Sequence, residues 1–165
     1  MTVSFLAYGA SGTESVAAAA PGDDATPVDI APYAHTAQGE LVYNFATPTG
    51  DFECFIAPSQ TSCQGQSVAP ATAANCADQA PGFTVDMTIT NWHSQTPGPD
   101  TVRSRCTDPG RPFAPNTQST TALPHGSKIS AYRFTCVTQT DGMTCRSNDS
   151  GGHGFRISKE SNSSF

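Results

Sequence analysis

Six cysteines carry the most definite chemistry in this chain of 165 residues. Zinc sites use closely spaced Cys or His pairs, whereas no two cysteines here are closer than Cys54 and Cys63, which have eight residues between them. An even set of widely spaced cysteines is typical of disulfides, which form in oxidising compartments outside the cytosol. The sequence therefore predicts an exported protein with three disulfides among Cys54, Cys63, Cys76, Cys106, Cys136 and Cys145.

The four histidines are the next candidates for catalysis or metal binding: His35, His93, His125 and His153. None forms an i, i+4 pair or a His-x-His alternation, the spacings that commonly hold a metal ion. The Gly-x-Ser-x-Gly nucleophile motif is absent, and a bonded cysteine offers no thiolate. We therefore expect no catalytic residue, no metal ligand and no cofactor.

Three side chains in turn-like contexts are candidate ligand contacts. Trp92 is the only tryptophan and precedes His93; exposed, it would anchor a partner, and buried, it would belong to the core. His153 lies between Gly152 and Gly154, which would let the backbone approach a ligand or simply make a tight turn. Trp92, His93 and His153 are the residues we assign to ligand contact, with the structural alternative open for each.

Short segments of alternating polarity predict the strands that must position these residues. In 83–90, apolar Val85, Met87 and Ile89 alternate with hydroxyl and acidic residues, so one row faces the core and the other faces water. The segment 101–106 repeats the pattern more weakly.

Arg103 and Arg105 share the solvent face of the segment 101–106. They are expected to be solvated strand residues, and an anion clamp is the alternative. Further strands are predicted at 40–45, 128–137 and 154–158, and one short helix at 71–79. The predicted fold class is all-β or mainly β, with antiparallel hairpins, long loops and at most one short helix.

Equal spacing within two cysteine pairs predicts two similar hairpins. With Cys136 opposite Cys145, residues 139–142 form the loop, and Gly142 takes a positive φ. The same register in the first hairpin leaves 57–60 as the loop. Directly opposed cysteines in an antiparallel pair lie close enough for a disulfide. The register and then elimination predict the bonds Cys54–Cys63, Cys136–Cys145 and Cys76–Cys106.

Composition narrows the class of protein. Charged residues make up 13% of the chain, and Gly 14 with Pro 13 disfavours long helices. The net charge of −6 and the scattered basic residues argue against a phosphate-tracking nucleic-acid binder and a polybasic membrane-surface domain. We expect the core to contain Leu41, Tyr43, Phe45, Phe52, Ile56, Phe83, Val85, Met87, Ile89, Tyr132, Phe134 and Phe155.

The N-terminal 38 residues are expected to lie outside the domain. A short apolar segment at 3–8 and the alanines at 17–20 look like part of a secretory signal peptide, and a disordered tail is the alternative. The disulfide-bonded domain is predicted at 39–161, with a C-terminal tail at 162–165. No segment is long and apolar enough for a transmembrane helix, so the expected location is secreted or cell-envelope.

Residues 45–54, Phe-Ala-Thr-Pro-Thr-Gly-Asp-Phe-Glu-Cys, resemble the opening Phe-x-Ser-Pro-Ser-Gly-Asn-Ile-x-Cys of a family of small exported actinobacterial proteins and lipoproteins, a domain of unknown function. In this chain Thr replaces Ser twice, and Gln79-Ala80 stands where the family usually has Trp-Gly. The resemblance implies an envelope or secreted location and transfers no catalytic residue. Later landmarks agree in order at 76–78, 123–126, 142–145, 152–155 and 158–161.

These features predict a secreted or cell-envelope binding domain without a catalytic centre, whose loops contact an envelope protein, glycan or lipid. A secreted hydrolase that pairs a loop histidine with a carboxylate in a deep pocket is the first alternative. A metal-binding or redox-active exported protein is the second. No nucleic-acid partner and no transmembrane segment are expected.

Overall fold

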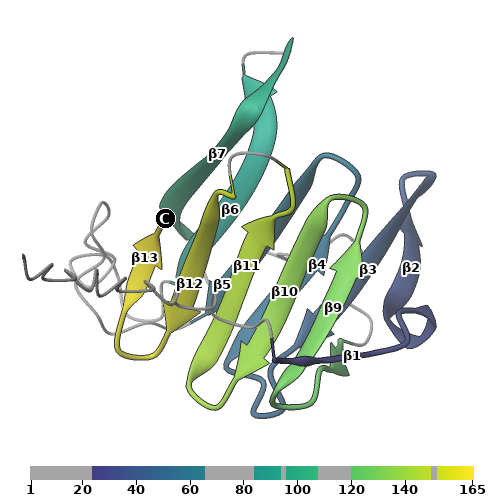
Figure 1. Ribbon diagram of the computed structural model, residues 1–165, viewed down its shortest axis with the longest axis vertical. Coiled ribbons are helices and arrows are strands. Elements are labelled where there is room, and N and C mark those ends of the chain that lie inside the picture. Colours follow the sequence, from purple (N-terminus) through teal and green to yellow (C-terminus); the bar gives the residue numbers. More distant parts are fainter. Residues whose placement is uncertain (1–23, 66–83, 94–95, 108–119, 150–151) are drawn as a thin grey trace, which may run out of the picture.

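The computed structural model describes residues 24–65, 84–93, 96–107, 120–149 and 152–165, and it is mainly β, as the sequence predicts (Figure 1). The one helical element in these ranges is a 3-10 turn, η1, at Ala31–Tyr33. The short helix predicted at 71–79 lies outside the described residues.

Two mostly antiparallel sheets stack face to face (Figure 1). The six-stranded sheet has the order β1-β9-β10-β11-β12-β13, and the seven-stranded sheet has the order β2-β3-β4-β5-β6-β7, with β8 also paired to β3. The hairpin of β6 and β7 extends beyond the sandwich. The first sheet contains β1 (Thr26–Pro27), β9 (Ser127–Ala131), β10 (Phe134–Gln139), β11 (Gly142–Ser147), β12 (Gly154–Ser158) and β13 (Asn162–Ser164). The second contains β2 (Ala34–Ala37), β3 (Glu40–Ala46), β4 (Phe52–Ile56), β5 (Gln60–Gly65), β6 (Thr84–His93), β7 (Thr96–Thr107) and β8 (Thr121–Ala122).

Both cysteine hairpins form in the predicted register. Cys54 pairs with Cys63 between β4 and β5, and Cys136 pairs with Cys145 between β10 and β11. Each opposed pair is a disulfide with a Cα–Cα distance of 4.1 Å. Cys106 is also disulfide-bonded, and its predicted partner Cys76 lies outside the described residues.

The prediction for Gly142 is wrong, because it lacks a positive φ. The strand pairing continues one step further than expected and pairs Gln139 with Gly142, so only two residues remain in the turn. Glycine is needed there for a different reason: a Cβ at Gly142 would collide with the carbonyl oxygen of Ile157 on β12.

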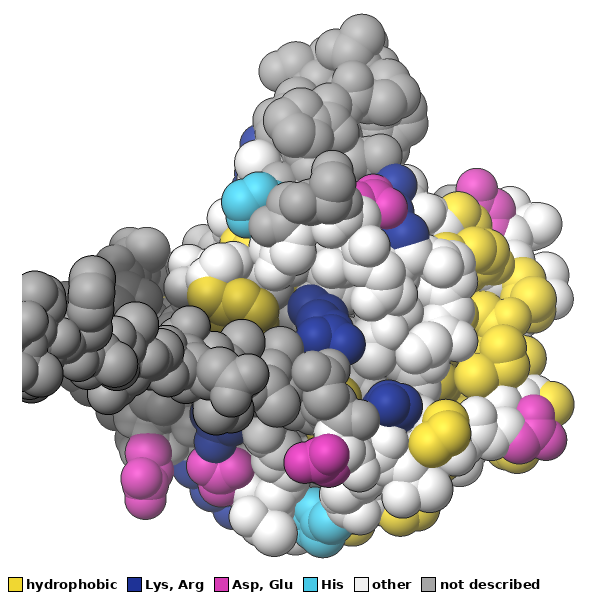
Figure 2. Space-filling model, viewed as in Figure 1, with side chains coloured by type: hydrophobic (Ala, Val, Ile, Leu, Met, Phe, Trp, Pro, Cys, Tyr) yellow, Lys and Arg dark blue, Asp and Glu magenta, His cyan; other side chains and the backbone are white. Residues whose placement is uncertain are grey.

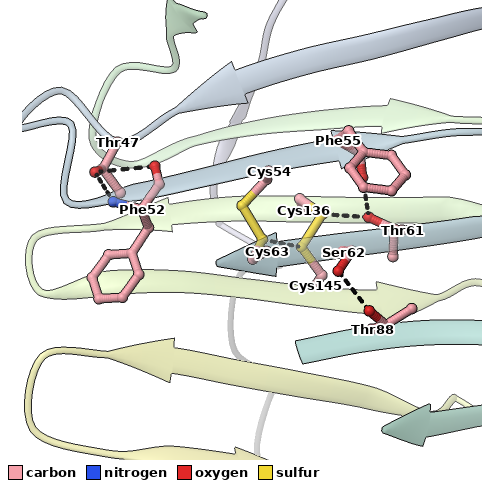
Figure 3. The surroundings of a disulfide bond; sticks show 10 residues. All are labelled: Thr47, Phe52, Cys54, Phe55, Thr61, Ser62, Cys63, Thr88, Cys136 and Cys145. Atoms are coloured by element: carbon pink, nitrogen blue, oxygen red, sulfur yellow. Dashed lines mark hydrogen bonds between the residues drawn. A yellow bond between two sulfur atoms is a disulfide. The ribbon is translucent and has the colours of Figure 1, made fainter. Parts of the chain in front are cut away.

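The two disulfides meet at the centre of the sandwich, one from each sheet (Figure 3). The Sγ atoms of Cys63 and Cys145 are 3.6 Å apart, and all four cysteines are fully buried. Thr61 accompanies them, with its Oγ1 atom 3.5 Å from the Sγ atom of Cys136. The surrounding core joins both sheets through fully buried Phe45, Ile56, Ile89, Leu123, Ile129, Phe134, Met143, Phe155 and Ile157.

Much of the segment that resembles the exported family forms the turn between β3 and β4. The Thr47 Oγ1 atom accepts a hydrogen bond from the Phe52 amide at 3.1 Å, and the Gly50 amide donates to the Thr47 carbonyl at 2.9 Å. Gly50 has a φ of 73°, a conformation that glycine adopts without a Cβ clash. These residues therefore fix the turn that places Phe52 in the core.

An ion pair connects this turn to the other sheet. The Lys159 Nζ atom, in the turn between β12 and β13, lies 2.8 Å from Oδ2 of Asp51. The hydrogen bonds from Lys159 and then Thr49 lower the pKa of the Asp51 carboxyl below its usual range. The carboxylate is therefore stabilised in its charged form at neutral pH.

The sheets extend beyond the domain bounds that the sequence predicted. Residues 26–37 supply β1, η1 and β2 before the expected start at residue 39, and Tyr33 is buried there against the main core. At the other end, the expected tail at 162–165 contains β13, which pairs with β12. Residues 26–37 and 162–165 therefore belong to the fold, the first through the apolar contacts of Tyr33 and the second through the pairing of β13.

Two other predictions need correction. The strand expected at 128–137 is two strands, because Tyr132 takes a φ of 53° in the turn between β9 and β10. Tyr132 and Leu41 were expected in the core but are 50% and 45% exposed. The Tyr132 hydroxyl instead donates to the Leu41 carbonyl at 2.7 Å, so these side chains cover the surface. Of the other core candidates, Phe83, Val85 and Met87 have side chains outside the described set.

Candidate functional site

The outer face of the seven-stranded sheet carries a row of side chains across four strands. Because Cys54 and Cys63 face the core, their neighbours Phe55 and Ser62 face outward by strand alternation. The pairing puts Phe55 beside Ser62, Ser62 beside Thr88, and Thr88 beside Arg103. Figure 3 shows Ser62 and Thr88 pointing toward each other, with their hydroxyl oxygens 2.6 Å apart.

This row is the centre of a groove of about 340 Å³. The floor consists of buried side chains: Phe55 is 6% exposed, Ser62 is 2% exposed and Thr90 is 8% exposed. The side chains of Arg103 and Arg105 are exposed along β7. The volume lies at the lower end of the range for small-molecule sites. We define the groove by its lining residues: Phe55, Gln60, Ser62, Thr88, Thr90, Arg103 and Arg105.

The two arginines lie in cross-strand rows of different composition. Arg105 pairs in register with Asp86, and Gln64 and Glu53 continue the same row on β5 and β4. The row of Arg103 contains no carboxylate, and no hydrogen bond or ion pair joins its side chain to another residue of the described segments. Arg103 therefore places a positive charge at one end of the groove, which an anionic ligand can pair with.

A small apolar cluster adjoins the other end of the groove. Phe55 packs with Ala37, Val42 and Ala57, separately from the main core between the sheets. The groove thus runs from an apolar end on β4, over hydroxyl and amide side chains on β5 and β6, to a guanidinium on β7. This arrangement can accept hydrogen bonds, donate them and pair with one negative charge.

Of the residues predicted to contact a ligand, only His153 has a described side chain, and it is not in the groove lining. Trp92 and His93 lie on the part of β6 that pairs with Pro97 and Thr96 of β7, and their side chains are outside the described set. His153 is exposed in the turn before β12, and no carboxylate pairs with it among the described residues.

The two glycines beside His153 have structural roles. Gly152 has a φ of 57°, and a Cβ at Gly154 would crowd the Phe165 ring and the Cys145 carbonyl. His125, in another turn, has its Nδ1 atom 3.0 Å from the Gln139 carbonyl. None of these histidines is brought to the groove lining.

Cysteine sulfurs make one close cluster of potential metal ligands. The Sγ atoms of Cys54, Cys63 and Cys145 all lie within 4.8 Å of one another. Cys54 and Cys63 are bonded to each other, and Cys145 is bonded to Cys136. Metal binding and nucleophilic attack both need a thiolate, so the oxidised cluster has a structural role.

The groove was missed in the sequence because it is assembled from strands distant in the chain. The alternation in 83–90 and 101–106 does place Thr88, Arg103 and Arg105 on a solvent face. The contribution of Gln60 and Ser62 depends on β5 lying beside β6, which alternation within one strand does not reveal. Both arginines are exposed on β7, as expected for solvated strand residues, and both line the groove.

The opposite face of the sandwich has a different character. Figure 2 shows Lys and Arg side chains spaced over a largely polar surface, with hydrophobic side chains gathered along the flank near β2. Arg156 on this sheet pairs with Asp141 across the turn between β10 and β11. Arg156 thus has an acidic partner, unlike Arg103 among the described residues.

Comparisons with protein-family models, curated proteins and solved structures found no match. In the described segments, no helix has the length and apolar character needed to cross a membrane.

Proposed function

We propose that this chain is an extracytoplasmic binding domain, secreted or held in the cell envelope, and that the groove is its ligand site. The observation that carries the proposal is the juxtaposition in one groove of a buried hydroxyl-lined floor and the guanidinium of Arg103, which has no partner among the described residues. Binding pockets typically combine a few convergent polar groups with apolar surface, and this groove has both.

The disulfides support the extracytoplasmic location. Bonds such as Cys54–Cys63 and Cys136–Cys145 form and persist in oxidising compartments. The resemblance of residues 45–54 to exported actinobacterial proteins points to the same location. The sandwich that packs around these bonds gives the groove a preformed floor, and a preformed floor lowers the entropy lost on binding.

A secretion experiment tests the location. The full chain is produced in an actinobacterial host, and culture medium, envelope and cytosol are treated with a thiol-blocking reagent before peptide mapping. We expect the protein in the medium or envelope, with every cysteine protected from the reagent. Recovery from the cytosol with modified cysteines would overturn the proposed location.

A sedimentation experiment tests the binding function. The oxidised protein is mixed with insoluble envelope from the host, and the fraction that sediments is compared between Arg103→Glu and the matched control Arg156→Glu. We expect retention by wild type and by the control, and loss of retention for Arg103→Glu. No retention of wild type, or equal retention of both variants, would contradict the assignment of the groove.

A further inference from the structure

The groove's chemistry allows a more specific statement about its ligand, which rests on the proposed binding function. We infer that the groove binds a short oligosaccharide carrying a carboxylate, with the sugar hydroxyls over β5 and β6 and the carboxylate on Arg103. Three features of the described residues lead to this ligand class: the lining, the single available charge and the length of the row.

The lining favours a ligand with many hydroxyl groups. Gln60, Ser62, Thr88 and Thr90 are neutral side chains that both donate and accept hydrogen bonds. A sugar hydroxyl also donates and accepts, so it can satisfy either role at each of these positions. A peptide backbone has fixed donors and acceptors at a fixed repeat. A peptide strand would add at the open edge of β7, whereas the groove lies across the outer face of β4 to β7.

The charge favours one acidic group instead of a polyanion. The protein carries a net charge of −6, which repels an extended polyanion such as a nucleic acid. Arg105 pairs in register with Asp86, whereas the row of Arg103 has no carboxylate. A guanidinium fork binds a carboxylate through two parallel hydrogen bonds, so Arg103 suits one carboxylate at the end of the groove.

The length of the row favours an oligosaccharide over one sugar ring. Phe55 and Arg103 are separated by three strand spacings, about 14 Å at ~4.8 Å each. At the far end, the apolar floor formed by Phe55 and its buried cluster suits the nonpolar face of a sugar. The ligand class thus matches the order of the side chains along the groove, which are apolar at one end, hydroxyl-bearing in the middle and cationic at the other end.

The test is calorimetric titration of the oxidised full chain with three probes at one ionic strength. The probes are short neutral oligosaccharides that end in one galacturonate, the same oligosaccharides after chemical reduction of that carboxyl group, and a capped peptide of similar length whose one charge is a glutamate. We expect the galacturonate-ended oligosaccharides to bind most tightly, with at least a tenfold weaker affinity for the reduced oligosaccharides, as expected when a charge-assisted hydrogen bond is lost.

Two substitutions separate the contributions of charge and hydroxyls. Arg103→Gln should weaken binding of the galacturonate-ended oligosaccharides at least tenfold and leave the affinity for the reduced oligosaccharides nearly unchanged. Thr88→Val keeps a β-branched side chain in β6 and removes its hydroxyl, so it should weaken binding of both oligosaccharides and not of the glutamate peptide. Arg156→Gln on the other sheet controls for the loss of one charge.

Each contrary outcome has a distinct meaning. Equal affinity for the galacturonate-ended oligosaccharides and the glutamate peptide would show an acidic-peptide or simple charge site and would overturn the inference. Absence of sugar binding, with envelope retention still lost in Arg103→Glu, would overturn the ligand class and leave the binding function intact. Absence of both would overturn the two proposals together.

Discussion

Deletion of one central disulfide should lower the free energy of unfolding by more than the loop-entropy contribution of that bond. The bond between Cys54 and Cys63 closes a loop with a sequence separation of 9. The chain-entropy relation gives about 3 kcal/mol for a loop of this size. Replacing both residues with alanine also leaves two methyl-sized voids beside the second disulfide, at about 1 kcal/mol each. The Cys54→Ala/Cys63→Ala variant should therefore lose about 5 kcal/mol of unfolding free energy.

The assay is urea unfolding followed by circular dichroism under non-reducing conditions. Free energies are compared instead of midpoints, because removing a cross-link expands the unfolded chain and raises the denaturant slope. A Cys54→Val/Cys63→Val variant refills the volume and should lose only the loop contribution of about 3 kcal/mol. This second variant also keeps the test informative if the alanine pair is too unstable to fold.

The other disulfide provides an internal comparison. Cys136 and Cys145 have the same sequence separation of 9 and the same complete burial, so their alanine pair should lose a similar free energy. Because the sulfurs of the two bonds touch, deleting both should not be additive. A loss below about 1 kcal/mol for either alanine pair would refute this account of the central bonds.

Three further predictions concern the turns. Gly142→Ala should destabilise the fold by about 1–3 kcal/mol in urea unfolding, because the new Cβ meets the Ile157 carbonyl and β12 must move. Thr47→Val should cost about 1–3 kcal/mol in the same assay, because a buried β4 amide loses its acceptor. Asp51→Asn should lower the thermal midpoint at pH 7 by removing the ion pair with Lys159. Since the folded-state pKa of Asp51 is lowered, this difference should be full above the ordinary aspartate range and vanish as the pH falls through the lowered value.

Matched substitutions serve as controls for these turns. Thr140→Ala, in the same turn as Gly142 but exposed, should be nearly neutral. Thr49→Val removes an exposed hydroxyl and should cost less than Thr47→Val. Equal effects within either pair would contradict the reasoning from burial, and a pH-independent effect of Asp51→Asn would contradict the role of its carboxylate.

The sequence predicted local pairing much better than distant assembly. Identical spacing gave the correct partners for Cys54 and Cys136, because hairpin register depends on residues close in the chain. Tyr132 was misplaced because its apolar ring suggests a core residue, whereas its positive φ in a turn puts it on the surface. Tyr33 was missed because a segment rich in small and polar residues gives little strand signal before its pairing partners are known.

The candidate site shows the same limit. The outward direction of Arg103 followed from alternation, but its distance from Phe55 followed only from the order of four strands. Strand order depends on the whole core, so no local pattern in 60–62 marks Gln60 and Ser62 as neighbours of β6. The ligand contacts proposed from unusual residue types, such as His153, were guided by chemistry without this spatial information.

The very short strands described at the ends of the sheets also bear on aggregation. Exposed outer strands invite pairing with strands of another molecule, and proteins limit this with short strands or prolines at sheet edges. Here β1 has two residues, β13 has three and β2 has four. The one long edge strand in the described part of the chain, β7, contains Pro97 and Pro99, which lack the amide hydrogen needed for pairing. We therefore expect the folded protein to resist edge-to-edge association even at high concentration.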